Sequence, residues 1–222
     1  MQFSKSLLFT AVALLAPIAM QADPISPSPT LSIDGLTFSN FTCNIFSSGT
    51  IYLPTSCAGV AVSTITLPGI GIEFDASNFL AGNASANDIR INYTVTSTAP
   101  ITTVGLDFNA IYAGLAVSSV TEELDNTIGT NVGFMSVSVG AAALGGSNVL
   151  SSSVAVNGSY TTLNIQKDIN LTATSNSSTQ ESYIQQTFST AAPEPGTTAL
   201  MGGGLMLFGL ALRGRFAKKQ AA

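Results

Sequence analysis

The side chains in this sequence that could perform acid–base catalysis are carboxylates. The 222 residues contain no histidine, so neither a Ser-His-Asp nor a Cys-His arrangement can form, and the commonest metal ligand is absent. Two acidic sets have the composition of a glycosidase pair: Glu73 with Asp75, and Glu122 and Glu123 with Asp125. We expect both sets to lie in solvated loops or at strand ends, and we therefore expect no enzymatic activity.

Oxygen ligands for a metal ion are spread along one stretch of the chain. Asp75, Asn78, Asn83 and Asp88 carry the carboxylate and amide oxygens that Ca²⁺ prefers. Their spacing matches neither an EF-hand nor a calcium-binding repeat loop. We therefore expect no metal site and no cofactor.

Aromatic side chains could bind carbohydrate, because the apolar faces of sugar rings stack on them. The chain has no tryptophan and five tyrosines. Tyr93 has the inward parity of a strand, which leaves Tyr52, Tyr112, Tyr160 and Tyr183 as candidate platforms. Each of these four is more commonly a cross-strand packing residue, so carbohydrate binding is the alternative function rather than the first one.

The two cysteines, Cys43 and Cys57, favour a disulfide. An even cysteine count is typical of disulfide pairing in an exported protein, and a metal site would lack further cysteine or histidine ligands. Closing a loop of about 15 residues stabilises a fold by roughly 3 kcal/mol in the chain-entropy description.

The elements that must position these residues are short strands. Runs rich in Val, Ile, Thr, Tyr and Phe are separated by turn signals, and no long segment has helical periodicity. About ten strands of this kind predict an all-β fold, an antiparallel β-sandwich. Residues 75–88 are predicted as a loop and the proline-rich residues 23–29 as an extended, mobile leader. The strand candidates are 36–42, 50–53, 60–66, 70–74, 89–96, 101–108, 112–120, 132–139, 149–156, 159–166 and 182–188.

The clearest strand is the segment 89–96, in which Ile89, Ile91, Tyr93 and Val95 alternate with polar residues. This alternation predicts a half-buried strand with water on one face.

Residues 149–172 contain both the strongest hairpin signal and one anomaly. Asn157-Gly158 separates two strand candidates, which predicts a tight hairpin between them. The second strand extends toward residue 172 and gives Lys167 the same inward parity as Leu163 and Ile169. We expect an edge position, where the ammonium group can reach water.

The charge of the central region excludes several partners. Residues 23–190 hold eleven of the twelve acidic residues but only two basic ones, Arg90 and Lys167. Nucleic acid is excluded as a partner because neutralising phosphates requires Lys and Arg, and an anionic membrane surface is disfavoured for the same reason. An acidic region rich in Ser, Thr and Asn is typical of a soluble extracellular domain of one-domain size.

The amino-terminal residues 1–22 have the order of a secretory signal peptide. Lys5 precedes an apolar stretch over 7–20, and Ala22 offers a small residue for cleavage. We expect export and removal of this segment.

The carboxyl-terminal residues 191–222 combine three features in a fixed order. Pro193-Glu194-Pro195 is followed by an apolar run over 197–212. This run would reach roughly 24 Å as a helix, which is short for a permanent membrane anchor. A basic cluster then holds the chain end in the cytoplasm; its members are Arg213, Arg215, Lys218 and Lys219.

This order of features resembles the PEP-CTERM sorting signal of Gram-negative bacteria. The resemblance implies that an exosortase, a membrane protease-transpeptidase, recognises the Pro-Glu-Pro motif. It also implies transient insertion of 197–212 into the inner membrane before the protein reaches the cell surface or matrix. Segments 38–43 and 167–169 are similar to uncharacterised β-rich domains that precede this signal, and this similarity does not identify an activity.

Together these observations predict a secreted structural protein of the cell surface or exopolysaccharide matrix. Its parts would be a signal peptide (1–22), a disulfide-clipped β-sandwich (23–190) and a sorting segment with a short transmembrane helix (191–222). The expected partners are an exosortase and extracellular polysaccharide. The alternative function is that of a carbohydrate-binding adhesin.

Overall fold

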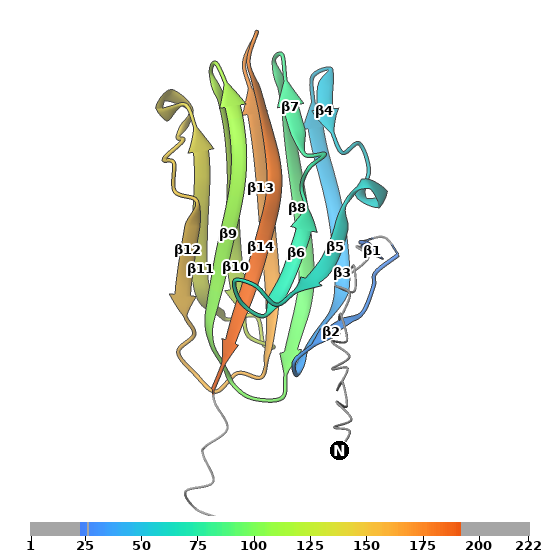
Figure 1. Ribbon diagram of the computed structural model, residues 1–222, viewed down its shortest axis with the longest axis vertical. Coiled ribbons are helices and arrows are strands. Elements are labelled where there is room, and N and C mark those ends of the chain that lie inside the picture. Colours follow the sequence, from blue (N-terminus) through green and yellow to red (C-terminus); the bar gives the residue numbers. More distant parts are fainter. Residues whose placement is uncertain (1–22, 26, 192–222) are drawn as a thin grey trace, which may run out of the picture.

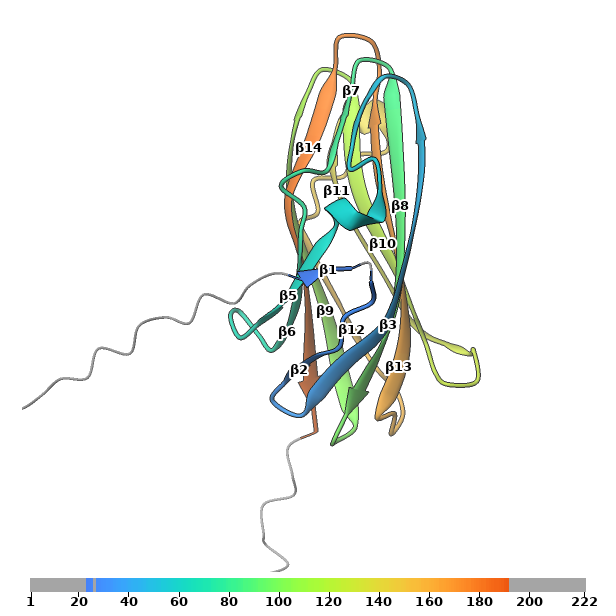
Figure 2. The same cartoon turned by 90° about the vertical axis from the view of Figure 1, so that its right-hand side faces the viewer.

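Two antiparallel sheets pack face to face and enclose the apolar side chains (Figures 1 and 2). The computed structural model describes residues 23–25 and 27–191, and this part of the chain forms fourteen strands and two short 3₁₀ helices. The predicted class, an antiparallel β-sandwich, is confirmed. The strands are more numerous than the ten expected, and four of them are 13 residues long.

The larger sheet has eight strands and is organised around β14. Strand β9 lies on one side of β14 and pairs in turn with β12. On the other side, β6 and β7 pair with different parts of β14; β6 continues to β5 and β1, and β7 continues to β4. The bounds are β1 Asp23–Pro24, β4 Ile51–Leu53, β5 Ala61–Ile65, β6 Gly71–Asp75, β7 Leu80–Gly82, β9 Ile101–Ala113, β12 Ser151–Ala155 and β14 Ser178–Thr190.

The smaller sheet has six strands in the order β11-β10-β13-β8-β3-β2. Its central strands β10, β13 and β8 pair over almost their whole lengths, so side chains of the three form straight rows across the sheet. The bounds are β2 Leu31–Ile33, β3 Leu36–Ser48, β8 Ser85–Ser97, β10 Ala116–Asp125, β11 Asn131–Gly140 and β13 Thr162–Ala173. Of the two 3₁₀ helices, η1 spans Cys57–Gly59 and η2 spans Ala142–Leu144.

Alternation of apolar and polar residues decides which face of each strand is buried. In β8, the apolar members Ile89, Ile91, Tyr93 and Val95 are all buried, as predicted. Tyr93 then contacts aromatic rings from both sheets: its ring centroid lies 5.2 Å from that of Phe41 in β3 and 6.0 Å from that of Phe74 in β6. Because Phe74 belongs to the larger sheet, these contacts join the two layers.

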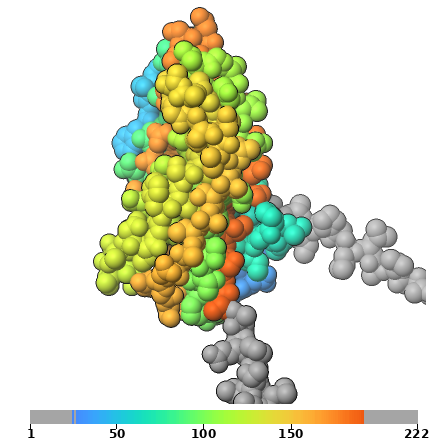
Figure 3. Space-filling model, turned by 90° about the vertical axis from the view of Figure 1, so that its left-hand side faces the viewer, coloured from blue at the N-terminus to red at the C-terminus, as the bar shows by residue number. Residues whose placement is uncertain are grey.

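At one edge the chain bridges the two sheets directly. Val149 and Ser138 exchange backbone hydrogen bonds of 2.8 and 2.9 Å, and the N–H of Phe108 donates to the carbonyl of Leu150 at 2.9 Å. Residues 149–150 therefore connect β11 of the smaller sheet to β9 of the larger one. Figure 3 shows this edge, where residues coloured yellow to gold cover most of the visible surface.

The predicted disulfide between Cys43 and Cys57 is confirmed, with a Cα–Cα separation of 5.9 Å. Cys43 lies in β3 of the smaller sheet, whereas Cys57 begins η1, between β4 and β5 of the larger sheet. The disulfide therefore links the β4–β5 connection of the larger sheet to β3 of the smaller sheet.

Several predicted boundaries were wrong. Residues 75–88 contain β7 and the start of β8, because Asn83 and Ala84 adopt positive φ angles of 49° and 60° and reverse the chain within two residues. The predicted strand 112–120 is divided at Gly114, whose φ of 72° turns the end of β9 into the start of β10.

The hairpin predicted at Asn157-Gly158 does not form. Strand β12 pairs with β9 in the larger sheet, whereas β13 pairs with β8 and β10 in the smaller one. The chain therefore crosses between sheets at this point. A turn signal indicates where a chain reverses but not which strands become partners.

The leader and Lys167 also differ from expectation. Strand β1 pairs with β5, Ile25 is buried, and its N–H donates to the carbonyl of Val60 at 2.8 Å, so this part of the leader belongs to the sheet. Lys167 is not at an edge: β13 lies between β10 and β8, and the Lys167 side chain is 0% exposed.

The expectations for the two chain ends fall outside the described residues. They concern the signal peptide with its Ala22 cleavage site, and the sorting motif, apolar run and basic cluster beyond residue 191. Among residues 23–25 and 27–191, no helix has the length and apolar character needed to cross a membrane.

Removing the disulfide should destabilise the sandwich. We expect the double variant Cys43→Ala/Cys57→Ala to lose about 3 kcal/mol of unfolding free energy, because the unfolded chain regains the entropy of an open loop. Urea denaturation followed by circular dichroism measures this loss, and reduced wild-type protein should show the same decrease. Equal midpoints for the oxidised and cysteine-free proteins would contradict the expectation.

Candidate functional site

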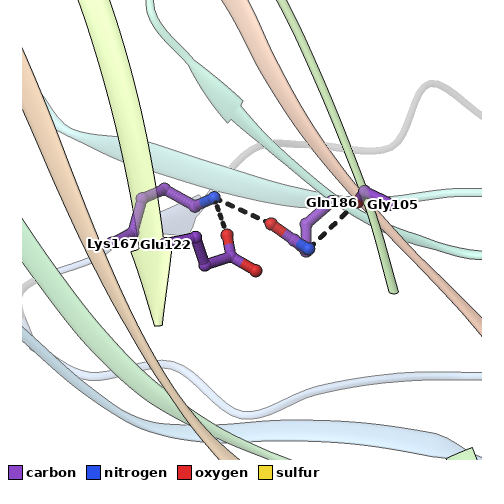
Figure 4. A network of polar contacts seen from close by, with 4 residues as sticks. All are labelled: Gly105, Glu122, Lys167 and Gln186. Atoms are coloured by element: carbon purple, nitrogen blue, oxygen red, sulfur yellow. Dashed lines mark hydrogen bonds and ion pairs between the residues drawn. The ribbon is translucent and has the colours of Figure 1, made fainter. Parts of the chain in front are cut away.

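A polar cluster lies in the interior, between the two sheets (Figure 4). Glu122 in β10 and Lys167 in β13 face each other in register, and both side chains are 0% exposed. Lys167 Nζ donates to Glu122 Oε2, and it also donates to Gln186 Oε1 at 2.7 Å. Gln186 belongs to β14, so the lysine connects the smaller sheet to the larger one.

Gln186 is itself fixed in orientation. Its Nε2 donates to the backbone carbonyl of Gly105 in β9 at 3.0 Å. Both ends of the amide therefore have a partner, one in each sheet, and the ring of Phe74 lies 5.9 Å from Lys167 Nζ on the apolar side.

A second carboxyl, Glu181, extends the cluster along β14. Ser118 Oγ in β10 donates to Glu181 Oε1, and both residues are buried. Three of the buried side-chain atoms that have no hydrogen-bond partner within the described part of the chain belong to this cluster: Glu122 Oε1, Glu181 Oε2 and Tyr93 Oη. An unpaired polar atom in a dry interior costs free energy, and for a carboxyl oxygen this cost is lower when the group is protonated and therefore uncharged.

Burial shifts the pKa of each ionisable side chain in this cluster. Loss of hydration raises the pKa of Glu181 to about 8, against the opposing effects of the Ser118 hydrogen bond and the Lys167 charge. Burial likewise raises the pKa of Glu122 and lowers that of Lys167, while their mutual attraction opposes both shifts. Burial, together with the charge of Glu122, raises the pKa of Tyr93. One ammonium cannot neutralise two carboxylates, so Glu181 holds a proton at neutral pH.

The acidic sets proposed from the sequence are not assembled as catalytic pairs. Glu122 is buried, which corrects the expectation of a solvated position, whereas its neighbour Glu123 is exposed on the other face of β10. Glu73 accepts a hydrogen bond from Gln185 Nε2 at 2.7 Å, and Asp75 accepts one from the N–H of Ser77 at 3.0 Å. The alternating pleat of β10 places Glu122 and Glu123 on opposite faces of the smaller sheet.

The four candidate calcium ligands are divided between the two sheets and the connections on either side of β7, where Asn78 and Asn83 lie. Asp75 ends β6 in the larger sheet, whereas Asp88 lies in β8 of the smaller sheet. Burial and the neighbouring Asp168 raise the pKa of Asp88. Within residues 23–25 and 27–191, no three His, Cys, Asp or Glu residues are close enough together to hold a metal ion.

The outer face of the smaller sheet carries rows of amide, hydroxyl and carboxylate side chains. One row runs from Thr42 through Asn92 and Gln166 to Glu123, and the next pairs Thr94 with Asn164. Asn92 Nδ2 donates to Thr42 Oγ1 at 3.2 Å, and Thr94 Oγ1 donates to Asn164 Oδ1 at 3.1 Å. We call this surface the polar face.

A hollow of about 330 Å³ lies on the polar face. Its lining offers both donors and acceptors from side-chain amides, and it consists of Asn40, Thr42, Asn92, Tyr93, Thr94, Asp125, Asn164, Ile165 and Gln166. A second hollow of about 410 Å³, on the outer face of the larger sheet, is lined by short Ser and Thr side chains, Gly105 and Asp107, and contains no amide side chain.

Two exposed phenylalanines flank the polar face. Phe46 in β3 is 58% exposed and lies opposite Asp88, and Phe134 in β11 is 56% exposed and lies opposite Glu123. Neither phenylalanine is among the aromatic platforms predicted from the sequence, all of which are tyrosines. Outward parity of a phenylalanine, visible in the alternation of Phe134 with the buried Met135 and Val137, was the available signal.

The candidate tyrosines have other positions. Tyr93 is buried, as predicted, and Tyr160 packs against the core. Tyr52 and Tyr183 are half-buried in β4 and β14 of the larger sheet. Tyr112, near the end of β9, is exposed.

Comparison with known proteins places the chain in no family. No protein-family model and no curated protein matches it. It is similar to the solved structure of TmCBM61 in complex with beta-1,4-galactotriose, with 8% identity, a TM-score of 0.32, and coverage of 65% of this chain and 86% of that chain. It is also similar to the CBM36-1 domain of a multidomain xylanase from the hindgut metagenome of Trinervitermes trinervoides, with 13% identity, a TM-score of 0.24, and coverage of 69% and 100%. At these identities and TM-scores, neither similarity assigns a ligand to this chain.

The proton on Glu181 predicts how stability depends on pH. The folded protein keeps this proton up to a pH of about 8, whereas the unfolded chain releases it near 4.5. The folded state therefore binds more protons between these values, so wild-type stability falls as pH rises through this window, by at most about 1.4 kcal/mol per pH unit. We expect Glu181→Gln, which stays neutral, to gain a few kcal/mol relative to wild type between pH 5 and pH 8.

Urea denaturation of both proteins at several pH values measures this difference. Glu123→Gln on the outer face of the smaller sheet is the control for the same chemical change, because the Glu123 side chain is exposed, and its difference from wild type should stay nearly constant. Parallel curves for Glu181→Gln and wild type would refute the assignment.

Proposed function

We propose that the chain is an exported domain of the bacterial cell surface or exopolysaccharide matrix, and that it binds polysaccharide through the polar face. The observation that carries the proposal is the ordered array of amide and hydroxyl groups around the hollow at Asn92, Asn164 and Gln166. These side chains are held in straight rows by the pairing of β8, β13 and β10, so they need little ordering on binding.

The chemistry of the polar face fits sugar hydroxyls. A hydroxyl group both donates and accepts hydrogen bonds, and an Asn or Gln amide does the same from adjacent atoms. Phe46 and Phe134 add exposed apolar rings on either side, on which sugar C–H faces could stack. The surface thus combines the two kinds of contact that carbohydrate recognition uses.

The charges on this face favour a neutral polysaccharide. Asp88, Asp125, Asp168 and Glu123 lie along it. The guanidinium of Arg90 is already paired with Asp168 at 3.3 Å. Repulsion by the carboxylates would weaken the binding of a uronic-acid or sulfated polymer.

Export and sorting form a separate part of the proposal. The resemblance of Pro193-Glu194-Pro195, the apolar run and the basic cluster to a PEP-CTERM signal supports processing by an exosortase. Strand β14 ends at Thr190, so a cut at the motif would leave every described strand intact. The acidic central region supports a location outside the cell, where solubility is required.

Alanine substitutions in the hollow should weaken polysaccharide binding. We expect Asn92→Ala/Gln166→Ala to weaken binding to a neutral exopolysaccharide at least tenfold, since both amides lose their hydrogen bonds. Affinity gel electrophoresis against a panel of neutral and acidic polysaccharides measures the change. Gln180→Ala in β14 is the control because Gln180 is exposed in the other sheet. Identical retardation of all three proteins would exclude this face as the binding surface.

Processing of the two chain ends can be measured by mass. We expect the protein isolated from its native host surface to lack residues 1–22 and the basic cluster at 213–219. Deletion of Pro193-Glu194-Pro195 should leave the tail attached and the protein in the membrane fraction. Recovery of full-length protein from the cytosol would contradict export and sorting. It would not bear on polysaccharide binding, which the alanine variants test separately.

A further inference from the structure

The buried cluster contains an amine, an amide and a carboxyl group in mutual contact, which are the components of an acyl transfer. We propose that Lys167 and Gln186 join to form an intramolecular amide cross-link between the two sheets, with Glu122 transferring the protons. This inference is independent of the proposed function, because it rests on the interior and not on the polar face.

The lysine is placed to act as a nucleophile. Its side chain is 0% exposed, and burial lowers its pKa, so the uncharged amine becomes accessible. The same burial raises the pKa of Glu122. Both shifts favour transfer of the proton from Nζ to Glu122 Oε2, its hydrogen-bond partner. A neutral amine beside a neutral acid replaces the ion pair in a medium that solvates charge poorly.

The amide is placed to act as the acyl donor. Gln186 Oε1 lies 2.7 Å from Lys167 Nζ, and Nε2 is held by the carbonyl of Gly105. Cδ, the atom to be attacked, is bonded to Oε1, so the reaction requires Nζ to move from the oxygen to the adjacent carbon. Two groups held in this way react as if each were present at a very high concentration.

Glu122 contacts both reacting groups. It accepts the hydrogen bond of Lys167 Nζ; burial raises its pKa, and the charge of Lys167 and, after it, the nearby Gln186 side chain oppose that rise. It can therefore give a proton to one group and take one from the other, as a general acid and base does.

The step is balanced without any co-reactant. The lone pair of Nζ forms a bond to Cδ of Gln186, and the C=O electron pair moves to Oε1, which takes a proton from Glu122. Glu122 recovers a proton from Nζ and passes it to Nε2, so the C–N bond breaks and ammonia leaves. The Oε1 proton returns to Glu122 as the carbonyl re-forms. The products are a secondary amide, ammonia and a protonated Glu122.

The product relieves the charge problem of the interior. The ammonium group disappears, and Glu122 and Glu181 both remain as neutral acids, consistent with the raised pKa of each. Water is excluded from the site because all the participating side chains are buried.

Proteolysis of the purified full-length protein, denatured and reduced, tests the proposal. Trypsin should fail to cut after Lys167 because its amine is acylated. A protease that cuts after glutamate should separate 124–181 from 182–222, because Pro195 blocks cleavage after Glu194. The two segments should nevertheless remain covalently joined and be lighter by one ammonia, about 17 Da. Cyclisation of Asn157 onto the Gly158 nitrogen also releases one ammonia, but it occurs within segment 124–181. Only the proposed cross-link joins the two segments to each other.

Variants assign the roles. Glu122→Gln should lose the cross-link, with folding checked by circular dichroism, and Gln185→Met should keep it, since Gln185 faces the opposite side of β14 from Gln186. Tryptic cleavage after Lys167 in wild-type protein, with two separate segments in the second digest, would overturn the proposal. Loss of one water, with Glu122 joined to Lys167, would overturn the choice of Gln186.

Discussion

One ammonium and two carboxyl groups lie between the sheets, and the need to balance their charge constrains the rest of the structure. Lys167 lies opposite Glu122 across the β10–β13 pair and reaches Gln186 in the facing sheet. A buried charge that loses its partner costs several kcal/mol. The register of β10 on β13 and the packing of β14 over both strands therefore depend on the same few side chains. A slip of β13 by one residue would turn Lys167 toward water and leave Glu122 buried without a cation.

The two sheets are held together at three separate places. The Lys167–Gln186 contact lies at the centre, the backbone bridge at 149–150 lies along one edge, and the Cys43–Cys57 disulfide fastens η1 to β3. Aromatic contacts around Tyr93 fill the space between them. Attachments of three different kinds therefore hold the two sheets, and the outer faces they carry, in a fixed relation.

The same alternation that buries the polar cluster also creates the polar face. In β13, Lys167 and Ile169 point inward, so Gln166, Asp168 and Asn170 point outward. Long, continuous strands turn this local rule into an ordered array of amides and hydroxyls. The length and regularity of these rows suit an extended polymer better than a small ligand, and for that reason the proposed partner is a polysaccharide.

The sequence by itself determined the fold class, the disulfide and the inward face of β8. Strand alternation, turn residues and a lone cysteine pair are local properties that few tertiary arrangements can override. It also marked Lys167 as an inward residue. It did not predict the strand pairing after Asn157-Gly158, because hydrogen bonding between distant strands depends on which sheet each strand joins.

Only the tertiary structure decided the partners of Lys167. Glu122 lies 45 residues away from it and Gln186 lies 19 residues away, and no periodicity connects the three. Their meeting follows from the register of β10 on β13 and from the packing of β14 across the interface. The polar face likewise required the order β10-β13-β8, because a row of side chains exists only after separate strands have been aligned.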